Sequence, residues 1–135
     1  LGICVGMQVL FEKSEEGEKK GLSIFSGCVK KLDFQSQSKD YKVPNVGYKK
    51  IFAYKPSGIF KKFEQTENFY FTHSYAVKEI ENDKDFNIAH CEHNFKFIAG
   101  FSYKNIFAVQ FHPEKSQSIG LKLISNFLEV KIWKD

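Results

Sequence analysis

Hydrophobic and polar residues alternate through most of the middle of this chain, and they recur with helical spacing only near its end. Short stretches rich in aromatic and β-branched residues, bounded by turn-forming residues, are typical of β-strands. Near the end, the apolar spacing predicts an amphipathic helix over residues 119–128, with Ser116 as its N-cap. The strands that the alternation predicts are residues 28–34, 51–54, 69–75, 88–93, 95–101 and 106–111.

The N-terminal part of the chain predicts a strand that leads directly into a helix. Residues 1–3 have the composition of the end of a buried strand, and residues 5–12 are helix formers. We expect a polar loop at residues 35–40, a turn-rich connector at residues 43–47 and a single helical turn at residues 59–63. Many short strands with a helix at each end predict an α/β fold with an antiparallel insert.

Composition and charge favour one globular domain and argue against nucleic-acid and membrane functions. The chain has 135 residues, 42% of them hydrophobic, and a formal net charge of +4. All 20 basic residues are lysines, so the forked guanidinium used for bidentate contacts to phosphate and guanine is missing. No apolar run approaches the roughly 18 residues of a membrane span. Three cysteines without paired spacing favour a reducing cytoplasm over a disulfide framework.

Residues 2–6 (GICVG) form the strongest local motif. At a strand-to-helix turn, a Cys flanked by small residues is typical of a nucleophile elbow, which exposes the sulfur above the sheet. The elbow would also aim the Val5 backbone N–H at a developing oxyanion, and a helix N-terminus beneath Cys4 would favour the thiolate. The alternative interpretation of so short a pattern is a small buried Cys between two glycines.

A candidate base for Cys4 follows the last predicted strand, in residues 110–114 (QFHPE). Side chains at positions i and i+2 of an extended segment lie on one face, so Glu114 can orient the imidazole of His112. Thiolate, imidazole and carboxylate together make a catalytic triad. The alternative for His112 alone is a surface histidine at a strand end.

Residues 90–93 (HCEH) contain metal-ligating side chain types, but we predict no metal site there. On a strand, alternate side chains face opposite ways, so the four side chains cannot converge on one ion. The lysine-rich stretches of the chain are expected to be solvated surfaces. The alternative is that they contact a partner, and Lys115 beside the triad would then belong to the same contact surface.

The chain resembles the class I, triad-type glutamine amidotransferases, whose nucleophile motif is similar to GICVGMQ and whose His/Glu motif is similar to VQFHPE. Within that family, the segments GLSIFSGCVKKL, KVPNVGYKKI and FYFTHSYAV extend the resemblance to the glutaminase subunits of imidazole glycerol phosphate synthases. The resemblance implies a flavodoxin-like α/β fold and hydrolysis of glutamine to glutamate and ammonia without a cofactor. Cys4 would form a γ-glutamyl thioester, and His112 held by Glu114 would transfer protons. The residues that match the glutamine pocket are Gly6, Gln8, Glu12, Ser74 and Tyr75; His73 is not a triad member.

The resemblance also implies a heterodimer in which ammonia passes to a (β/α)8-barrel cyclase subunit that makes imidazole glycerol phosphate and AICAR in histidine biosynthesis. The family connector that faces this partner commonly reads PHMGW, whereas residues 44–48 here read PNVGY. Asn45, Val46 and Tyr48, together with Lys115, are therefore the expected partner contacts. The altered connector leaves two alternatives open: a paralogue that supplies ammonia for amidation of a cell-surface sugar, and an inactive binding module.

The chain starts inside an apolar run without an initiator Met. We therefore expect residues 1–135 to be the C-terminal portion of a type-1 glutamine amidotransferase domain, whose preceding strands would complete the sheet and the oxyanion hole. Missing neighbours of a buried sheet expose apolar edges. On its own, this segment is expected to be aggregation-prone and without measurable glutaminase activity.

Overall fold

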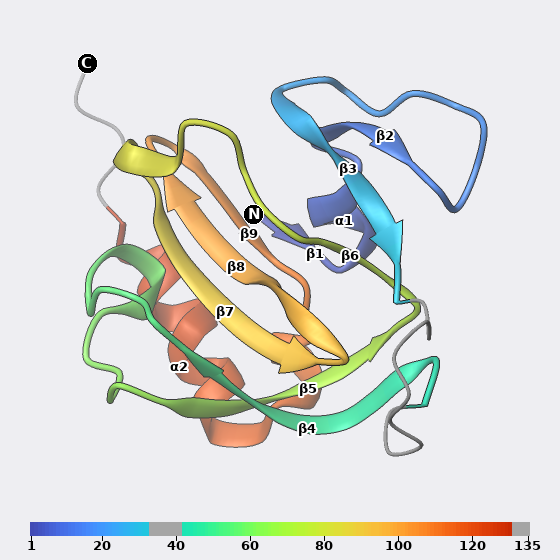
Figure 1. Ribbon diagram of the computed structural model, residues 1–135. Helices are drawn as coiled ribbons and strands as arrows, with labels where there is room; N and C mark the ends of the chain where they lie inside the picture. The colour runs from blue at the N-terminus through green and yellow to red at the C-terminus, as the bar shows by residue number, and fades with distance from the viewer. Residues whose placement is uncertain (33–41, 131–135) are drawn as a thin grey trace.

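The computed structural model describes residues 1–32 and 42–130, which fold into two sheets and a C-terminal helix (Figure 1). The strands of these residues are β1 (Gly2–Ile3), β2 (Phe11–Ser14), β3 (Phe25–Lys31), β4 (Asn45–Phe52), β5 (Glu67–His73), β6 (Tyr75–Val77), β7 (Asn87–His93), β8 (Phe95–Tyr103) and β9 (Ile106–Val109). The helices are α1 (Val5–Gln8) and α2 (Gln117–Leu128), with short 3-10 turns η1 (Gly58–Phe60), η2 (Asp83–Asp85) and η3 (Pro113–Lys115).

Over the described residues, the larger sheet has the strand order β1-β9-β8-β7-β4-β5. Strand β1 pairs in parallel with β9, and the other neighbours in this sheet are antiparallel. The smaller sheet has the order β2-β3-β6, in which β2 and β3 are parallel and β3 and β6 are antiparallel. The mixed α/β architecture with antiparallel strands that the sequence predicts is therefore confirmed.

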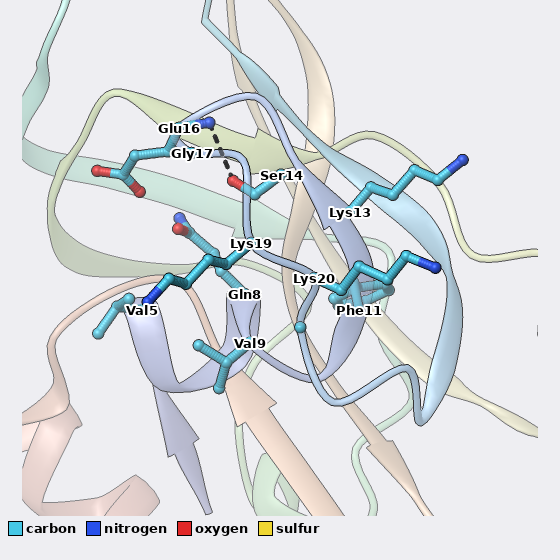
Figure 2. A pocket seen from close by; sticks show the side chains of 11 residues that line it. Val5, Gln8, Val9, Phe11, Lys13, Ser14, Glu16, Gly17, Lys19 and Lys20 are labelled. Atoms are coloured by element: carbon cyan, nitrogen blue, oxygen red, sulfur yellow. Dashed lines mark hydrogen bonds between the residues drawn. The ribbon is translucent and has the colours of Figure 1, made fainter.

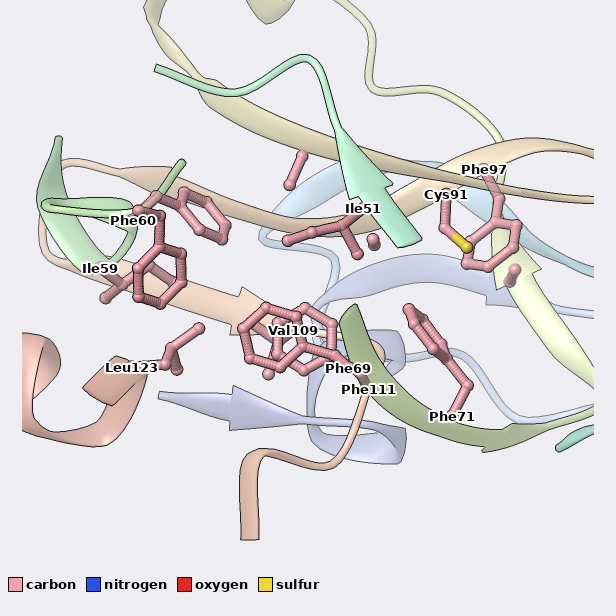
Figure 3. Packing of buried hydrophobic residues seen from close by; sticks show 14 of the residues in the cluster. Ile51, Ile59, Phe60, Phe69, Phe71, Cys91, Phe97, Val109, Phe111 and Leu123 are labelled. Atoms are coloured by element: carbon pink, nitrogen blue, oxygen red, sulfur yellow. The ribbon is translucent and has the colours of Figure 1, made fainter. Parts of the chain in front are cut away.

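Aromatic side chains fill the cores on both faces of the larger sheet. On one face, Phe69 and Phe111 stack with ring centroids 4.0 Å apart, and Leu123 of α2 packs into the same cluster (Figure 3). On the other face, Met7 of α1 and Phe11 of β2 belong to a cluster that lies between the larger and the smaller sheet. Stacked and edge-to-face rings stabilise a core beyond the effect of burial alone. The same packing fixes β9 and the segment that follows it from both sides.

Several predicted elements agree with the structure. The strands predicted at residues 88–93 and 95–101, the single turn near residue 59 and the C-terminal helix are confirmed. The strands β7 and β8 are joined at Asn94, which has a φ of 68°. Phe34 and the predicted loop at residues 35–40 lie outside the described residues.

The predicted helix over residues 5–12 is wrong beyond its first turn. Helix α1 ends at Gln8, and β2 begins at Phe11 and pairs with β3. Phe11 is buried in contact with the rings of Phe25 and Phe101, so tertiary packing overrides the local helix propensity.

Two boundaries near the middle of the chain also differ from the prediction. Residues 45–47 of the connector expected at 43–47 already belong to β4, in which Asn45 is paired with His73. The expected single strand at residues 69–75 is broken at Ser74: β5 ends at His73 in the larger sheet, and β6 begins at Tyr75 in the smaller one. The chain therefore crosses from one sheet to the other here. No helix of the described residues is long and apolar enough to cross a membrane.

Ser116 directly precedes α2 as predicted, but it does not cap the helix with its side chain. Its hydroxyl donates to the His112 carbonyl over 2.6 Å and accepts the Tyr70 N–H over 2.9 Å. The Ser116 side chain therefore ties β5 to the segment after β9 instead of satisfying the first turn of the helix.

The close approach of β1 to α1 requires a glycine at position 2. A Cβ atom at Gly2 would lie 2.6 Å from the Gly6 carbonyl oxygen, which is backbone and cannot move away cheaply. We expect Gly2→Ala to lower the free energy of unfolding by about 1–3 kcal/mol. In the control Gly17→Ala, the added Cβ would meet none of the described residues within 4 Å, and we expect a change within about 0.5 kcal/mol. Urea unfolding of both variants of the full-length protein measures the difference; equal stabilities would contradict this account of the elbow.

Candidate active site

Cys4 sits at a sharp turn between β1 and α1. Its φ of 52° and ψ of −110° are unusual for a residue with a side chain, and such strain concentrates at functional sites. The Cys4 N–H donates to the Val109 carbonyl of β9 over 2.8 Å, and the Cys4 carbonyl accepts the N–H groups of Met7 and Gln8. The half-buried thiol is thus fixed to the sheet on one side and to α1 on the other, in the geometry expected of a nucleophile elbow.

His112 and Glu114 lie at the same edge of the sheet as Cys4. Because β1 and β9 are parallel, with Ile3 opposite Val109, the residues after both strands emerge together. The Nδ1 atom of His112 lies 2.5 Å from a Glu114 carboxylate oxygen. When Nδ1–H donates to this carboxylate, Nε2 of the neutral ring is left as a proton acceptor. The pair can therefore act as an oriented base.

The backbone around His112 is held from two directions. The His112 N–H donates to the Tyr70 carbonyl of β5 over 2.8 Å. On the other side, α2 packs so closely on η3 that a Cβ at Gly120 would lie 1.8 Å from the Pro113 carbonyl oxygen. A glycine at position 120 thus lets the helix lock the segment that carries the imidazole and the carboxylate.

Gln110 contacts the thiol directly, and sequence reasoning missed it. Its Nε2 lies 3.6 Å from Cys4 Sγ, and its Oε1 accepts a hydrogen bond from Gln8 Nε2 over 3.0 Å. The side chain is fully buried. Its position two residues before His112 was the available signal, because both then lie on one face of an extended segment.

Burial raises the pKa of the Cys4 thiol above its ordinary value of 9.0. The backbone N–H of Val5 and the amide of Gln110 lower it, whereas the negative charges of Glu16 and Glu114 raise it. The Val5 N–H at the start of the helix thus favours the thiolate as expected, but the pKa of Cys4 as a whole is raised. Helix α1 has a single turn, and its effect is outweighed by desolvation and two carboxylates.

A cavity of about 270 Å³ opens beside α1 and is covered by the loop that follows β2 (Figure 2). Val5 and Gln8 line it from the helix, and Glu16, Lys19 and Lys20 line it from the loop. Val5 is 60% exposed, so its side chain faces this open side. The cavity is thus lined by one carboxylate, Glu16, and by three lysines, of which Lys19 points toward Val5 while Lys13 and Lys20 point away from it (Figure 2).

The predicted pocket residues are only partly brought together. Gln8 lines the cavity, and open space surrounds the position where a Cβ of Gly6 would lie. Tyr75 contacts Gln8 through its carbonyl, and the Ser74 carbonyl accepts the N–H of Leu32. Glu12 lies on β2 and lines a different cavity, together with Cys28 and Lys78. Glu16 takes the place beside the elbow instead.

The predicted partner contacts divide into a surface group and a buried residue. Val46 and Tyr48 are about half exposed on β4, at 50% and 46%. The Tyr48 hydroxyl donates to the Lys115 carbonyl over 3.0 Å, which links this strand to η3 beside the triad. The expectation that Asn45 lies at the surface is wrong, because its side chain is completely buried against His73.

Residues 90–93 run along β7, with Cys91 and His93 buried and Glu92 exposed. Across the parts of the chain that the structure describes, no group of three or more His, Cys, Asp or Glu side chains is placed to hold a metal ion.

Comparisons with known proteins identify similar sequences and folds. The family model described as "Glutamine amidotransferase class-I" matches residues 1–130. The imidazole glycerol phosphate synthase subunit HisH of Thiobacillus denitrificans is 42% identical over 132 residues, covering 95% of this chain and 57% of that protein. The subunit of the same name from Leptospira borgpetersenii is 41% identical, covering 94% and 61%. The chain thus spans about 60% of the length of these relatives.

Among solved structures, a putative GMP synthase protein from Thermoplasma acidophilum has a TM-score of 0.64 at 25% identity, covering 93% of this chain and 53% of that one. The glutaminase domain of Trypanosoma brucei CTPS, solved with bound acivicin, has a TM-score of 0.56 at 17% identity, covering 94% and 59%. These likenesses confirm the α/β fold that the sequence predicts.

The raised pKa of Cys4 predicts its reactivity in the absence of substrate. Only the thiolate is nucleophilic, and a raised pKa leaves less of it at any given pH. We expect iodoacetamide to alkylate Cys4 slowly at neutral pH, with a rate that still increases above pH 9.0. Peptide mapping after timed alkylation separates Cys4 from Cys28 and Cys91. A rate that levels off below pH 9.0 would contradict the role of burial described above.

Proposed function

The chain belongs to the class-I glutamine amidotransferase family, and we propose that it forms the glutaminase part of a two-subunit synthase that transfers ammonia. The observation that carries the proposal is the arrangement at the sheet edge. A strained Cys4 follows β1, and a His112–Glu114 pair follows the parallel neighbour β9. Nucleophile, base and orienting carboxylate are the components of a triad for acyl transfer.

In the proposed reaction, the Cys4 sulfur attacks the side-chain carbonyl carbon of glutamine while His112 takes the thiol proton. The Val5 N–H, which already points at the Cys4 sulfur, stabilises the oxyanion of the tetrahedral intermediate. His112 then returns its proton to the leaving nitrogen, so that ammonia departs and a γ-glutamyl thioester remains. The same imidazole removes a proton from water, which attacks the thioester and releases glutamate and the thiol.

The cavity beside α1 supplies charges that match the two ends of the substrate. We assign Glu16 to the α-ammonium group of glutamine, and Lys19, whose side chain points toward Val5 in Figure 2, to its α-carboxylate. Gly6 leaves space for the substrate backbone, and Gln8 forms the floor of the pocket. A carboxylate that is compensated by a bound ammonium group also repels the thiolate less, so substrate binding favours ionisation of Cys4.

The names of the relatives, which are subunits of an imidazole glycerol phosphate synthase, support a partner subunit. We propose that this partner is a (β/α)8-barrel cyclase that uses the ammonia to make imidazole glycerol phosphate and AICAR. Val46, Tyr48 and Lys115 form the proposed docking surface, because they adjoin the triad and two of these side chains are exposed apolar or aromatic groups. We further propose that the chain is the C-terminal portion of the domain and works in the cytoplasm, where its three free cysteines stay reduced.

The altered connector favours one alternative function, a paralogue that passes ammonia to a different acceptor such as a surface sugar. Two of the altered connector residues, Val46 and Tyr48, lie at the docking surface, and the triad residues are unchanged. Glutaminase activity of the full-length protein with and without the cyclase separates the two functions. Glutaminase activity that the cyclase stimulates supports the histidine pathway. Glutaminase activity that is the same with and without the cyclase supports the paralogue.

Loss of the nucleophile or the base should abolish catalysis. Because Cys4 and His112 act as one unit, we expect Cys4→Ala and His112→Ala each to lower kcat by more than about 1000-fold. Glu114→Gln should cost less, since the carboxylate orients the ring without accepting a proton. Steady-state kinetics with the cyclase present measures this order. A glutamine-analogue electrophile should label Cys4 and spare Cys28 and Cys91; equal labelling would refute the assignment of the nucleophile.

The two carboxylates of the β2 region should differ sharply in their effect on glutamine binding. Glu16→Gln removes the charge assigned to the α-ammonium group, so we expect KM for glutamine to rise roughly 10-fold with little change in kcat. Glu12→Gln is the matched control, because Glu12 lines the other cavity, and KM should stay within about twofold. The reverse order would return the glutamine site to Glu12.

A further inference from the structure

We propose that Gln110 is a further catalytic residue that holds the Cys4 thiol, and that a buried hydrogen-bond chain behind it fixes the direction of its side-chain amide. The kinetic consequence of this inference rests on the proposed glutaminase function. The geometric part of the inference does not rest on that function, because the hydrogen bonds are present in the protein without substrate. The roles proposed above for the triad and the cavity do not include the contacts of Gln110 with Cys4 and Gln8.

The near end of the chain of hydrogen bonds connects α1 to β9. Gln8 Nε2 donates to the Gln110 Oε1 over 3.0 Å, and Gln110 Nε2 then lies 3.6 Å from Cys4 Sγ. Gln8 is 8% exposed and Gln110 is fully buried, so water does not compete for these groups. If the Gln110 amide were reversed, two NH2 groups would face each other, and its oxygen would face the sulfur. Gln8 therefore compels Gln110 to present a donor to the thiol.

The middle of the chain fixes Gln8 in turn. One hydrogen of Gln8 Nε2 is used for Gln110, and the same nitrogen donates to the Tyr75 carbonyl over 3.0 Å. This carbonyl also accepts His73 Nδ1–H over 2.8 Å. Tyr75 starts β6 directly after the break at Ser74 that moves the chain between the two sheets. The unusual crossing of the chain thus delivers a carbonyl that two donors share.

The far end lies at the start of β4. With Nδ1–H used for the Tyr75 carbonyl, the Nε2 atom of His73 must accept, and Asn45 Nδ2 lies 3.0 Å from it. Burial lowers the pKa of His73, the hydrogen bond to the Tyr75 carbonyl opposes this effect, and the nearby His93 and His112 add to it, which together place the pKa at about 4. His73 is therefore neutral near pH 7, which is the only state that fits a donor on one nitrogen and an acceptor on the other.

Each hydrogen bond in this series fixes which atom donates and which accepts in its neighbour. The last donor of the series lies against the Cys4 sulfur. A neutral amide donor lowers the pKa of Cys4 and holds the sulfur while its proton passes to His112. The buried histidine, which takes no part in the triad, positions this donor from a distance. An isolated, freely rotating glutamine could turn its oxygen toward the thiol, and the chain prevents that.

The test compares Gln110→Met with the surface control Gln65→Met in the full-length protein with its cyclase. Methionine keeps the length of the side chain but cannot donate to sulfur. We expect the midpoint pH of Cys4 alkylation to move up by roughly one unit and kcat to fall roughly 10-fold. KM should stay within about twofold. Gln65 is exposed, and its variant should match the parent protein.

Two further variants make the result decisive. Gln8→Met should shift the alkylation midpoint in the same direction, and the double variant should shift it little more than Gln110→Met alone, because both break one chain. Gln110→Glu keeps the size and the acceptor for Gln8, places a carboxylate against the sulfur, and should raise the midpoint further. Circular dichroism checks that each variant folds.

An unchanged alkylation midpoint in Gln110→Met, or in Gln110→Glu if the first variant fails to fold, would overturn the role of Gln110. Additive shifts for Gln8→Met and Gln110→Met would overturn the chain behind it. Alkylation needs no turnover, so a shifted midpoint in a protein without glutaminase activity would refute the proposed function and leave this inference standing.

Discussion

The parallel pairing of β1 with β9 is the constraint on which the site depends. Ile3 lies opposite Val109, so Cys4 and Gln110 are the next residues along the two neighbouring strands. The hydrogen bond from the Cys4 N–H to the Val109 carbonyl extends the ladder into the turn. In a parallel pair, both chains leave the sheet at the same edge. Residues more than a hundred positions apart in the sequence are therefore brought together by the backbone before any side chain contributes.

The rest of the fold keeps that edge in place. Phe111 is stacked on Phe69 inside the core, so the residue between the thiol contact and the imidazole cannot swing outward. Ser116 ties the His112 carbonyl to β5, and Gly120 lets α2 approach η3. A catalytic group that is misplaced by even an ångström loses much of its effect. The dense aromatic packing on the α2 face is thus part of the site as well as of the stability.

The sequence indicated the parts of the site that depend on short-range geometry. A Cys between a strand and a helix predicts an elbow, and the i, i+2 spacing of His112 and Glu114 predicts their contact, which is 2.5 Å in the structure. What it could not indicate were features set by distant packing. Helix α1 ends early because Phe11 is buried in the second core cluster. Glu12 therefore lies on β2 and lines a different cavity, whereas Glu16 lines the cavity beside α1.

The same reason explains why Asn45 was misplaced and Gln110 was overlooked. A polar side chain on a strand is usually exposed, and only the pairing of β4 with β5 shows that His73 is there to pair with the Asn45 amide nitrogen. Gln110 lies in a motif whose histidine and glutamate carry the recognisable chemistry. Its partners Gln8 and Cys4 come from the other end of the chain.

The raised pKa of Cys4 gives the site a physical logic. Desolvation and the charges of Glu16 and Glu114 keep the thiol protonated, whereas the donors from Val5 and Gln110 stand ready for the anion. Under the proposed function, bound glutamine places its ammonium group beside Glu16, which removes one of the causes that raise the pKa. His112 then needs to accept the proton only when a carbonyl carbon is in reach. Under the proposed function, the charge of Glu16 thus couples the reactivity of the thiol to occupancy of the cavity.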